Sequence, residues 1–166
     1  LPIIGEGGRK SWQVYSRPFD QTDTRPRIAI VFVGLGVSAI ATKTVLKKIP
    51  GPISLAFAPY SRGLKDWISA SRAAGHEVLV DLPMEPFECP KNDPGPYTLL
   101  TTLPEDQNKY RLHWVLSRLT GYVGVSTFMG SKFTTKPNKL RPLIKELKTR
   151  GLMLLDVREN PLSSAA

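Results

Sequence analysis

Five short apolar runs alternate with four segments of helical character, and this alternation constrains the fold more than any other feature. The first run, residues 27–33, is almost continuously apolar and β-branched, as expected of a strand buried on both faces. Ser38 suits the N-cap of the next helix, and we expect Ile40, Ala41, Thr44 and Val45 on its inner face. Repeated strand–helix units predict a parallel sheet with right-handed crossovers. The predicted strands are 27–33, 53–57, 76–82, 122–126 and 152–156, and the predicted helices are 38–48, 62–74, 104–119 and 136–150.

The length fits one domain preceded by an arm. The chain has 166 residues, of which 41% are hydrophobic, enough to build a core. Residues 1–26 show no periodicity and interleave Gly and Pro with aromatics. They form either an extended arm that packs on the domain or a disordered linker, and residues 27–166 form the domain. Because the chain starts at Leu1 and not at a Met, we expect an upstream segment that could carry a signal or a membrane anchor.

The net charge of +9 is unevenly distributed along the chain. Residues 76–108 are acidic, whereas residues 109–150 contain ten Lys and Arg side chains and one acid. These cations fall on the outer faces of two predicted helices and do not interleave with exposed aromatics. This pattern is typical of solvated helices, so we predict no nucleic-acid partner.

Three carboxylates stand at or near the ends of predicted strands, where the reacting groups of parallel α/β folds gather. Asp81 lies in the third strand, Glu85 follows it in the sequence D-L-P-M-E-P, and Asp156 ends the fifth strand. Such acids can bind a hard cation, accept hydrogen bonds from sugar hydroxyls or act as a general base. They can equally cap loop amides or pair with Lys and Arg. Asp93, in the sequence D-P-G-P, fits a structural turn.

Several other chemistries lack the residues that they need. The single Cys89 excludes an internal disulfide and a cysteine-based zinc cluster. Neither His76 nor His113 lies at the carboxyl end of a predicted strand, which excludes a His-rich zinc site. No Ser occupies a nucleophile elbow. Gly34-Leu35-Gly36 matches part of a dinucleotide fingerprint, but no acid ends the second strand, so we do not predict NAD binding.

Five separated motifs, in this order, resemble the divergent polysaccharide deacetylases. They fall at 28–36 (I-A-I-V-F-V-G-L-G), 75–86, 92–100, 121–134 and 150–156, so that the resemblance covers about residues 26–166. It implies an α/β fold, a distorted (β/α) barrel of the carbohydrate-esterase type that here lacks its last strand–helix units. It also implies removal of acetyl groups from an N-acetylated polysaccharide, with a divalent metal such as zinc polarising the carbonyl and activating water.

The chain departs from the metal-binding pattern of that family. Val33 and Gly34 stand where the pattern has two Asp, while Asp81 and Phe128 stand where it commonly has His. The remaining carboxylates would hold at most a weak site for a hard cation, because zinc would lack its imidazoles. We therefore expect no cofactor and no metal site.

The resemblance to the family and the changed metal-binding positions together predict a degenerate family member. It would act in carbohydrate or cell-envelope metabolism by binding a glycan or an envelope protein. The alternative is an active hydrolase that removes acetyl groups through a carboxylate site. The candidate catalytic residues are Asp81, Glu85 and Asp156, and the candidate substrate-binding residues are Asp93, Met129 and Lys132. We expect a periplasmic location with an anchor in the inner membrane upstream of residue 1. An open sheet edge would favour self-association.

Overall fold

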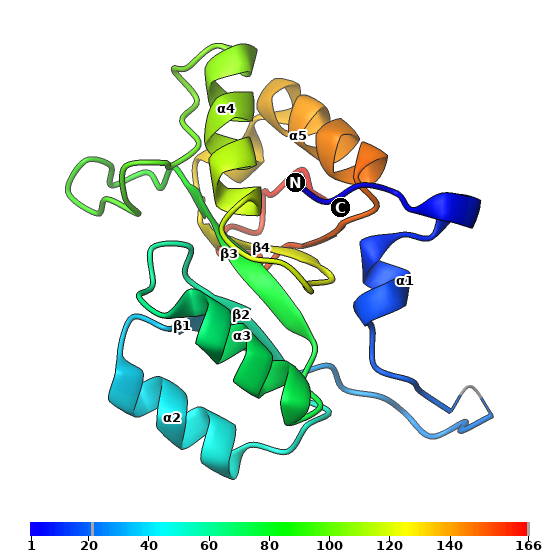
Figure 1. Ribbon diagram of the computed structural model, residues 1–166. Coiled ribbons are helices and arrows are strands. Elements are labelled where there is room, and N and C mark those ends of the chain that lie inside the picture. Colours follow the sequence, from blue (N-terminus) through cyan, green and yellow to red (C-terminus); the bar gives the residue numbers. More distant parts are fainter. Residues whose placement is uncertain (21, 166) are drawn as a thin grey trace.

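Five parallel strands form one sheet in the order β1-β2-β3-β4-β5 (Figure 1). The computed structural model describes residues 1–20 and 22–165. The strands are β1 (Val31–Leu35), β2 (Ser54–Phe57), β3 (Val78–Met84), β4 (Gly124–Met129) and β5 (Met153–Leu155). Neighbours along the chain are neighbours in the sheet, as in a (β/α) barrel. The predicted fold class, an α/β fold with a partial barrel, is confirmed.

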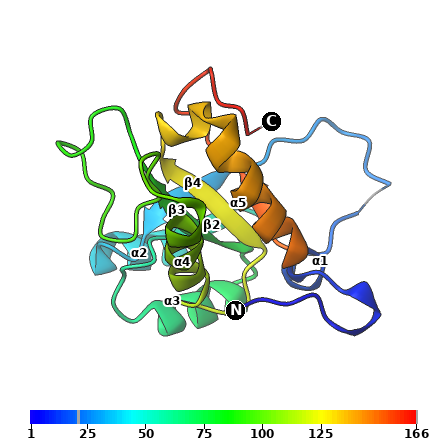
Figure 2. The same ribbon diagram turned by 90° about the horizontal axis from the view of Figure 1, so that it is seen from above.

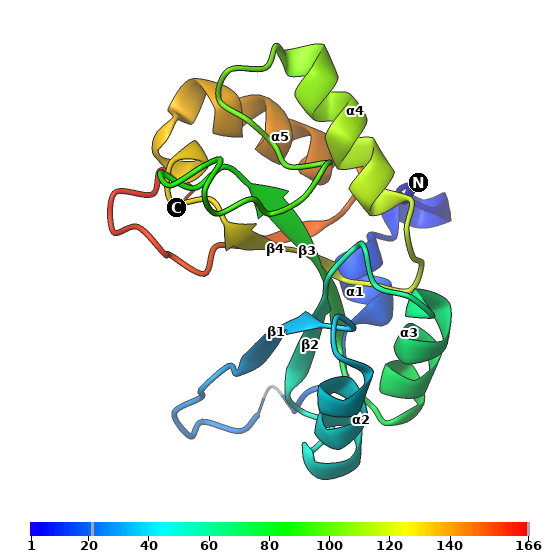
Figure 3. The same ribbon diagram turned by 90° about the vertical axis from the view of Figure 1, so that its left-hand side faces the viewer.

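Four helices connect the strands and cover one face of the sheet. They are α2 (Ala39–Lys48), α3 (Leu64–Ala73), α4 (Glu105–Leu116) and α5 (Pro137–Thr149). Figure 3 shows α2 and α3 over the β1–β2 half and α4 and α5 over the β3–β4 half, and Figure 2 shows α5 running along β4. The main core lies between these helices and the sheet and includes Leu55, Val80, Leu82, Leu116 and Leu147. None of the described helices has the length and apolar character that crossing a membrane requires.

β1 and α2 are less buried than their sequence indicates. Ser38 caps α2 as predicted, since its hydroxyl accepts a hydrogen bond from the N–H of Ala41 (3.3 Å). Of the residues predicted on the inner face of α2, Ile40 (81%), Ala41 and Thr44 are exposed and only Val45 packs against the core, while Val33 in β1 is 46% exposed. β1 pairs only with β2 among the described residues, so its outer side lacks the cover that an inner strand receives. A continuous apolar run therefore predicted a strand correctly but not its place in the sheet.

The N-terminal arm packs against the amino-terminal ends of the strands. It contains the short helices η1 (Glu6–Gly8) and α1 (Ser11–Tyr15). Tyr15 contacts a small cluster on the face opposite the helices, made of Ala56, Leu79 and Val123. The guanidinium of Arg17 donates to the carbonyl of Gly75 (3.1 Å), and that of Arg72 donates to the carbonyl of Tyr15. Trp12 and Phe19 remain exposed, so the described arm packs through only part of its aromatic side chains.

Candidate functional site

Asp81 lies inside β3, whose seven residues are all buried, and the protein itself engages both of its carboxylate oxygens. Oδ2 accepts a hydrogen bond from the N–H of Gly34 (2.8 Å), and Oδ1 accepts one from the hydroxyl of Ser126 (2.7 Å). The register explains the second contact, because Asp81 is directly opposite Ser126 on β4. Burial raises the pKa of Asp81, and the two donors oppose this rise only in part.

Gly34 donates to Asp81 because the backbone of β1 turns sharply at this point. Its φ of 73° lies in the left-handed region, which glycine adopts without the clash that a side chain would cause. The N–H of Gly34 thus points at a carboxylate on a strand two positions away in the sheet.

Glu85 joins the long loop after β3 to the segment that follows β4. Its Oε1 forms an ion pair with Nζ of Lys132 (2.7 Å), and its Oε2 accepts a hydrogen bond from the N–H of Thr101 (2.6 Å). Its backbone carbonyl also accepts the N–H of Phe133 (3.0 Å). Burial acts to raise the pKa of Glu85, but Lys132 and Thr101 together hold it below its usual value. Glu85 and Lys132, both predicted site residues, therefore form an ion pair that holds the loop after β3 against the segment after β4.

Asp156 follows β5 and belongs to a different hydrogen-bond network. Its Oδ1 accepts hydrogen bonds from the hydroxyl of Thr127 (3.3 Å) and the N–H of Arg158 (2.9 Å). Its Oδ2 is buried and has no hydrogen-bond partner among the residues that the structure describes. Consecutive residues of a strand point to opposite faces, so Ser126 and Thr127 contact Asp81 and Asp156 on opposite faces of β4.

The two remaining predicted residues, Asp93 and Met129, occupy turns. Oδ1 of Asp93 accepts a hydrogen bond from the N–H of Gly95 (2.8 Å), the local contact expected of an aspartate in a turn. Met129 ends β4 with a φ of 56°, a left-handed conformation that costs a side-chain-bearing residue about 1–2 kcal/mol. Across the described ranges, no hydrogen bond links Asp93 to Asp81 or Glu85.

The donor set at the strand ends does not fit the divalent metal that the family pattern implies. Within residues 1–20 and 22–165, no three His, Cys, Asp or Glu side chains lie close enough together to hold a metal ion. The oxygens of Asp81 are engaged by Gly34 and Ser126, and those of Glu85 by Lys132 and Thr101. Zinc sites are built from several imidazole, thiolate or carboxylate ligands that converge on one point.

The sequence reasoning missed the neutral donors that occupy the carboxylates. Ser126 and Thr127 are adjacent in the chain, and each holds a different acid. Their signal was present, because two hydroxyl residues near the end of a predicted strand lie next to the strand that carries Asp81. The contact from Gly34 gave no such signal, since it depends on a backbone N–H and on the turn at the end of β1.

The parallel sheet and its covering helices are those of a partial (β/α) barrel with carboxylates at the ends of its strands. Residues 30–166 match the divergent polysaccharide deacetylases, and the chain belongs to that family. It is 28% identical over 130 residues to the uncharacterized protein YibQ of Escherichia coli K12, an alignment that covers 78% of this chain and 40% of YibQ. The crystal structure of the uncharacterized protein ATU2773 from Agrobacterium tumefaciens C58 matches with a TM-score of 0.95 and 34% identity, covering 98% of this chain and 66% of that one.

Proposed function

We propose that this member of the divergent polysaccharide deacetylase family binds a glycan and does not carry out metal-dependent deacetylation. The observation that carries the proposal is the state of Asp81, which is 1% exposed and has both oxygens engaged by Gly34 and Ser126. A carboxylate that acts as a metal ligand or a general base must present a free oxygen to the ion or the water. Each oxygen of Asp81 already accepts a hydrogen bond from the protein, and at 1% exposure the carboxylate is closed to an ion or a water arriving from solvent.

The alternative, a hydrolase with a carboxylate site, draws support from two features. Oδ2 of Asp156 has no partner in the described part of the chain, and the raised pKa of Asp81 is typical of acids that exchange protons. That site would need Asp81, Glu85 and Asp156 to converge within about 3–6 Å of one point. Their separate hydrogen-bond networks weigh against such convergence and favour the binding function.

An acetate-release assay on N-acetylated chito-oligosaccharide, with zinc, manganese or cobalt added, tests the proposal. We expect no acetate above the buffer blank with any of the metals. Isothermal titration calorimetry with neutral and acidic oligosaccharides on the same preparation should show binding. Metal-dependent acetate release that Asp81→Ala abolishes would overturn the proposal in favour of the hydrolase. Binding of an envelope protein without binding of any sugar would replace the glycan with a protein partner.

The proposed binding of a glycan or an envelope protein also implies where the protein acts in the cell. Glycans and envelope proteins are periplasmic partners, so we propose that the chain acts in the periplasm, held at the inner membrane by an upstream anchor. The outer edges of β1 and β5, which pair with no further strand among the described residues, would also support self-association. Fractionation of cells that express the full gene product, followed by immunoblotting, tests the location.

A further inference from the structure

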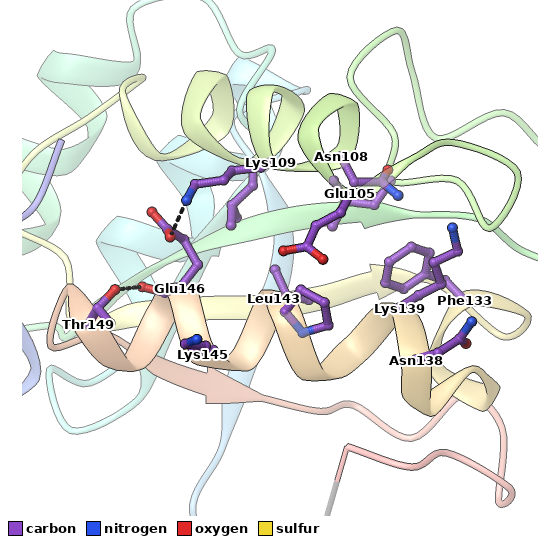
Figure 4. A pocket seen from close by; sticks show the side chains of 13 residues that line it. Glu105, Asn108, Lys109, Phe133, Asn138, Lys139, Leu143, Lys145, Glu146 and Thr149 are labelled. Atoms are coloured by element: carbon purple, nitrogen blue, oxygen red, sulfur yellow. Dashed lines mark hydrogen bonds and ion pairs between the residues drawn. The ribbon is translucent and has the colours of Figure 1, made fainter.

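A groove of about 300 Å³ separates α4 from α5 on the outside of the partial barrel (Figure 4). Its volume lies at the lower end of the range seen for ligand pockets. Its walls carry polar side chains from both helices, among them Glu105 and Lys109 from α4 and Asn138, Lys145 and Glu146 from α5. This groove lies on the helix face of the sheet and does not involve the strand-end residues described above.

Pro142 contributes to the groove because it interrupts the hydrogen bonding of α5. Proline has no N–H, so the carbonyl of Asn138, four residues earlier, loses its helical partner. Both residues line the groove. Neither the side-chain amide of Asn138 nor the carboxylate of Glu105 has a hydrogen-bond or ion-pair partner among the described residues, and Figure 4 shows the Glu105 carboxylate pointing between the helices. The groove thus offers unengaged polar groups to a ligand.

The exposed lining of the groove is a mixture of polar and apolar surface. The large apolar residues beneath the groove are almost completely covered by the protein itself, at 6% exposure or less, namely Leu99, Leu112, Phe133 and Leu143. Bases of a nucleic acid would find no exposed aromatic ring in the lining on which to stack. A mixed lining of this kind suits a sugar, because a sugar has both hydroxyls and apolar C–H faces.

The charge around the groove is positive. Residues 136–150 contain six Lys and Arg side chains and one acid, Glu146. That acid is already paired with Lys109, His113 and Arg150. Lys139 and Lys145, which line the groove, form no ion pair with any carboxylate in the described ranges. Their charge remains available to a ligand.

We propose that the α4–α5 groove binds an anionic glycan, with a sugar ring between the helices and the carboxylates or phosphates of different sugar units at Lys139 and at Lys145. This inference rests on the proposed glycan-binding function and assigns that function to a surface away from the strand ends. Contacts from the two lysines together should raise affinity about tenfold over a neutral sugar. Glu105 faces the same groove, so its charge opposes an anionic ligand.

Calorimetric titration with a hexamer of galacturonic acid, compared with neutral maltohexaose, tests the proposal. We expect the acidic hexamer to bind at least about tenfold more tightly than the neutral one. Lys139→Gln with Lys145→Gln should weaken it at least about tenfold, and Gln at 139 can still donate to the carbonyl of Leu103 that Lys139 now contacts (2.6 Å). Glu105→Gln should tighten binding of the acidic hexamer, because it removes a repelling charge. If the groove instead bound a neutral sugar through the Glu105 carboxylate, the same change would not tighten binding.

The matched control is Lys43→Gln with Lys47→Gln, which removes the same charge from exposed positions of α2. This variant should bind like the wild type. An equal loss of affinity for the acidic hexamer in both double variants would overturn the proposal that it binds in the groove. Binding would then depend on net charge alone. Capture on phosphatidylglycerol vesicles, with no binding of the hexamer, would replace the glycan with a membrane surface. If the wild type and the Lys139→Gln, Lys145→Gln variant bind the acidic hexamer equally, the hexamer does not bind in the groove, while the proposed glycan-binding function stands. If the wild type binds no sugar, the proposed function itself fails.

Discussion

Asp81 and Glu146 are two largely buried carboxylates whose surroundings have opposite effects. Asp81, inside β3, meets only neutral donors, Gly34 and Ser126, and burial raises its pKa. Glu146, on α5, is also partly desolvated, but the contacts with His113, Lys109 and Arg150 lower its pKa to about 2. A carboxylate held by neutral donors is a structural hydrogen-bond acceptor, whereas one held by cations is a charge that the fold stabilises.

The same difference separates the strand ends from the α4–α5 face of the molecule. At the strand ends, internal hydrogen bonds engage Asp81, and the apolar side chains of Val33 and Phe128 stand nearby in the sequence of β1 and β4. The α4–α5 face carries the free cations and the groove. The proposed glycan contact is therefore on the outer helices, and substitutions at Asp81, Glu146, Glu85 and Thr127 test the two regions against each other.

Asp81→Ala should have the largest effect on stability. It leaves the N–H of Gly34 and the hydroxyl of Ser126 without an acceptor in a buried position, so we expect a loss of about 3 kcal/mol in the free energy of unfolding. Asp81→Asn should cost less than about 1 kcal/mol, because its oxygen still accepts from Gly34 and the Ser126 hydroxyl can turn to accept from its amide. Urea denaturation measures both. Equal losses would show that the negative charge itself is required there.

Glu146→Gln should lower the free energy of unfolding by about 2 kcal/mol at pH 7, because Lys109 and Arg150 lose their anionic partner and His113 loses a hydrogen-bond acceptor. The pKa of Glu146 is depressed from 4.5 to about 2, so its contribution is complete above pH 4.5 and disappears as the pH falls toward 2. The stabilities of wild type and variant should therefore converge across that interval. A difference that stays constant down to pH 2 would contradict the ion-pair account.

Glu85→Gln should have a smaller effect, about 1 kcal/mol, because the amide keeps part of the hydrogen bonding to Thr101 and Lys132 but loses the ion pair. Hydrogen exchange at the amide of Thr101 should become faster, since this residue is fastened to Glu85. Glu88→Gln, an exposed acid three residues further on, is the control and should change neither quantity. Unchanged exchange in both variants would show that Glu85 does not fasten the loop.

Thr127→Val should have the smallest effect, less than about 1 kcal/mol. The hydroxyl of Thr127 donates to Asp156 (3.3 Å) and accepts the N–H of Val157 (3.0 Å), and valine keeps the shape without either contact. Thr127→Ser should restore most of the loss, as thermal unfolding can measure. If serine fails to restore it, the methyl group and not the hydroxyl carries the role.

The sequence predicted the fold well because the fold depends on local periodicity. All five strands and four helices occur near their predicted positions, and Ser38 caps α2. Side-chain burial in β1 and α2 was predicted poorly, since Val33 and Ile40 owe their exposure to the place of β1 at the edge of the sheet. Edge position is a tertiary property that no local pattern encodes.

The site was only partly predictable for the same reason. Asp81, Glu85 and Lys132 were singled out from strand ends and motifs, and the structure gives each of them a defined polar contact. That Asp81 and Asp156 contact opposite faces of β4 depends on register, which the sequence left open. The α4–α5 groove was not predicted, because the Lys and Arg residues of these helices match the pattern of ordinary solvated helix surface.

Metal analysis of the purified chain after equilibration with zinc tests the central claim most directly. Because the oxygens of Asp81 and Glu85 are engaged within the protein, we expect zinc well below one equivalent per chain, equally in wild type and Asp81→Asn. Stoichiometric zinc in the wild type that is lost in Asp81→Asn would contradict the account. It would mean that Asp81 gives up Gly34 and Ser126 to bind the ion.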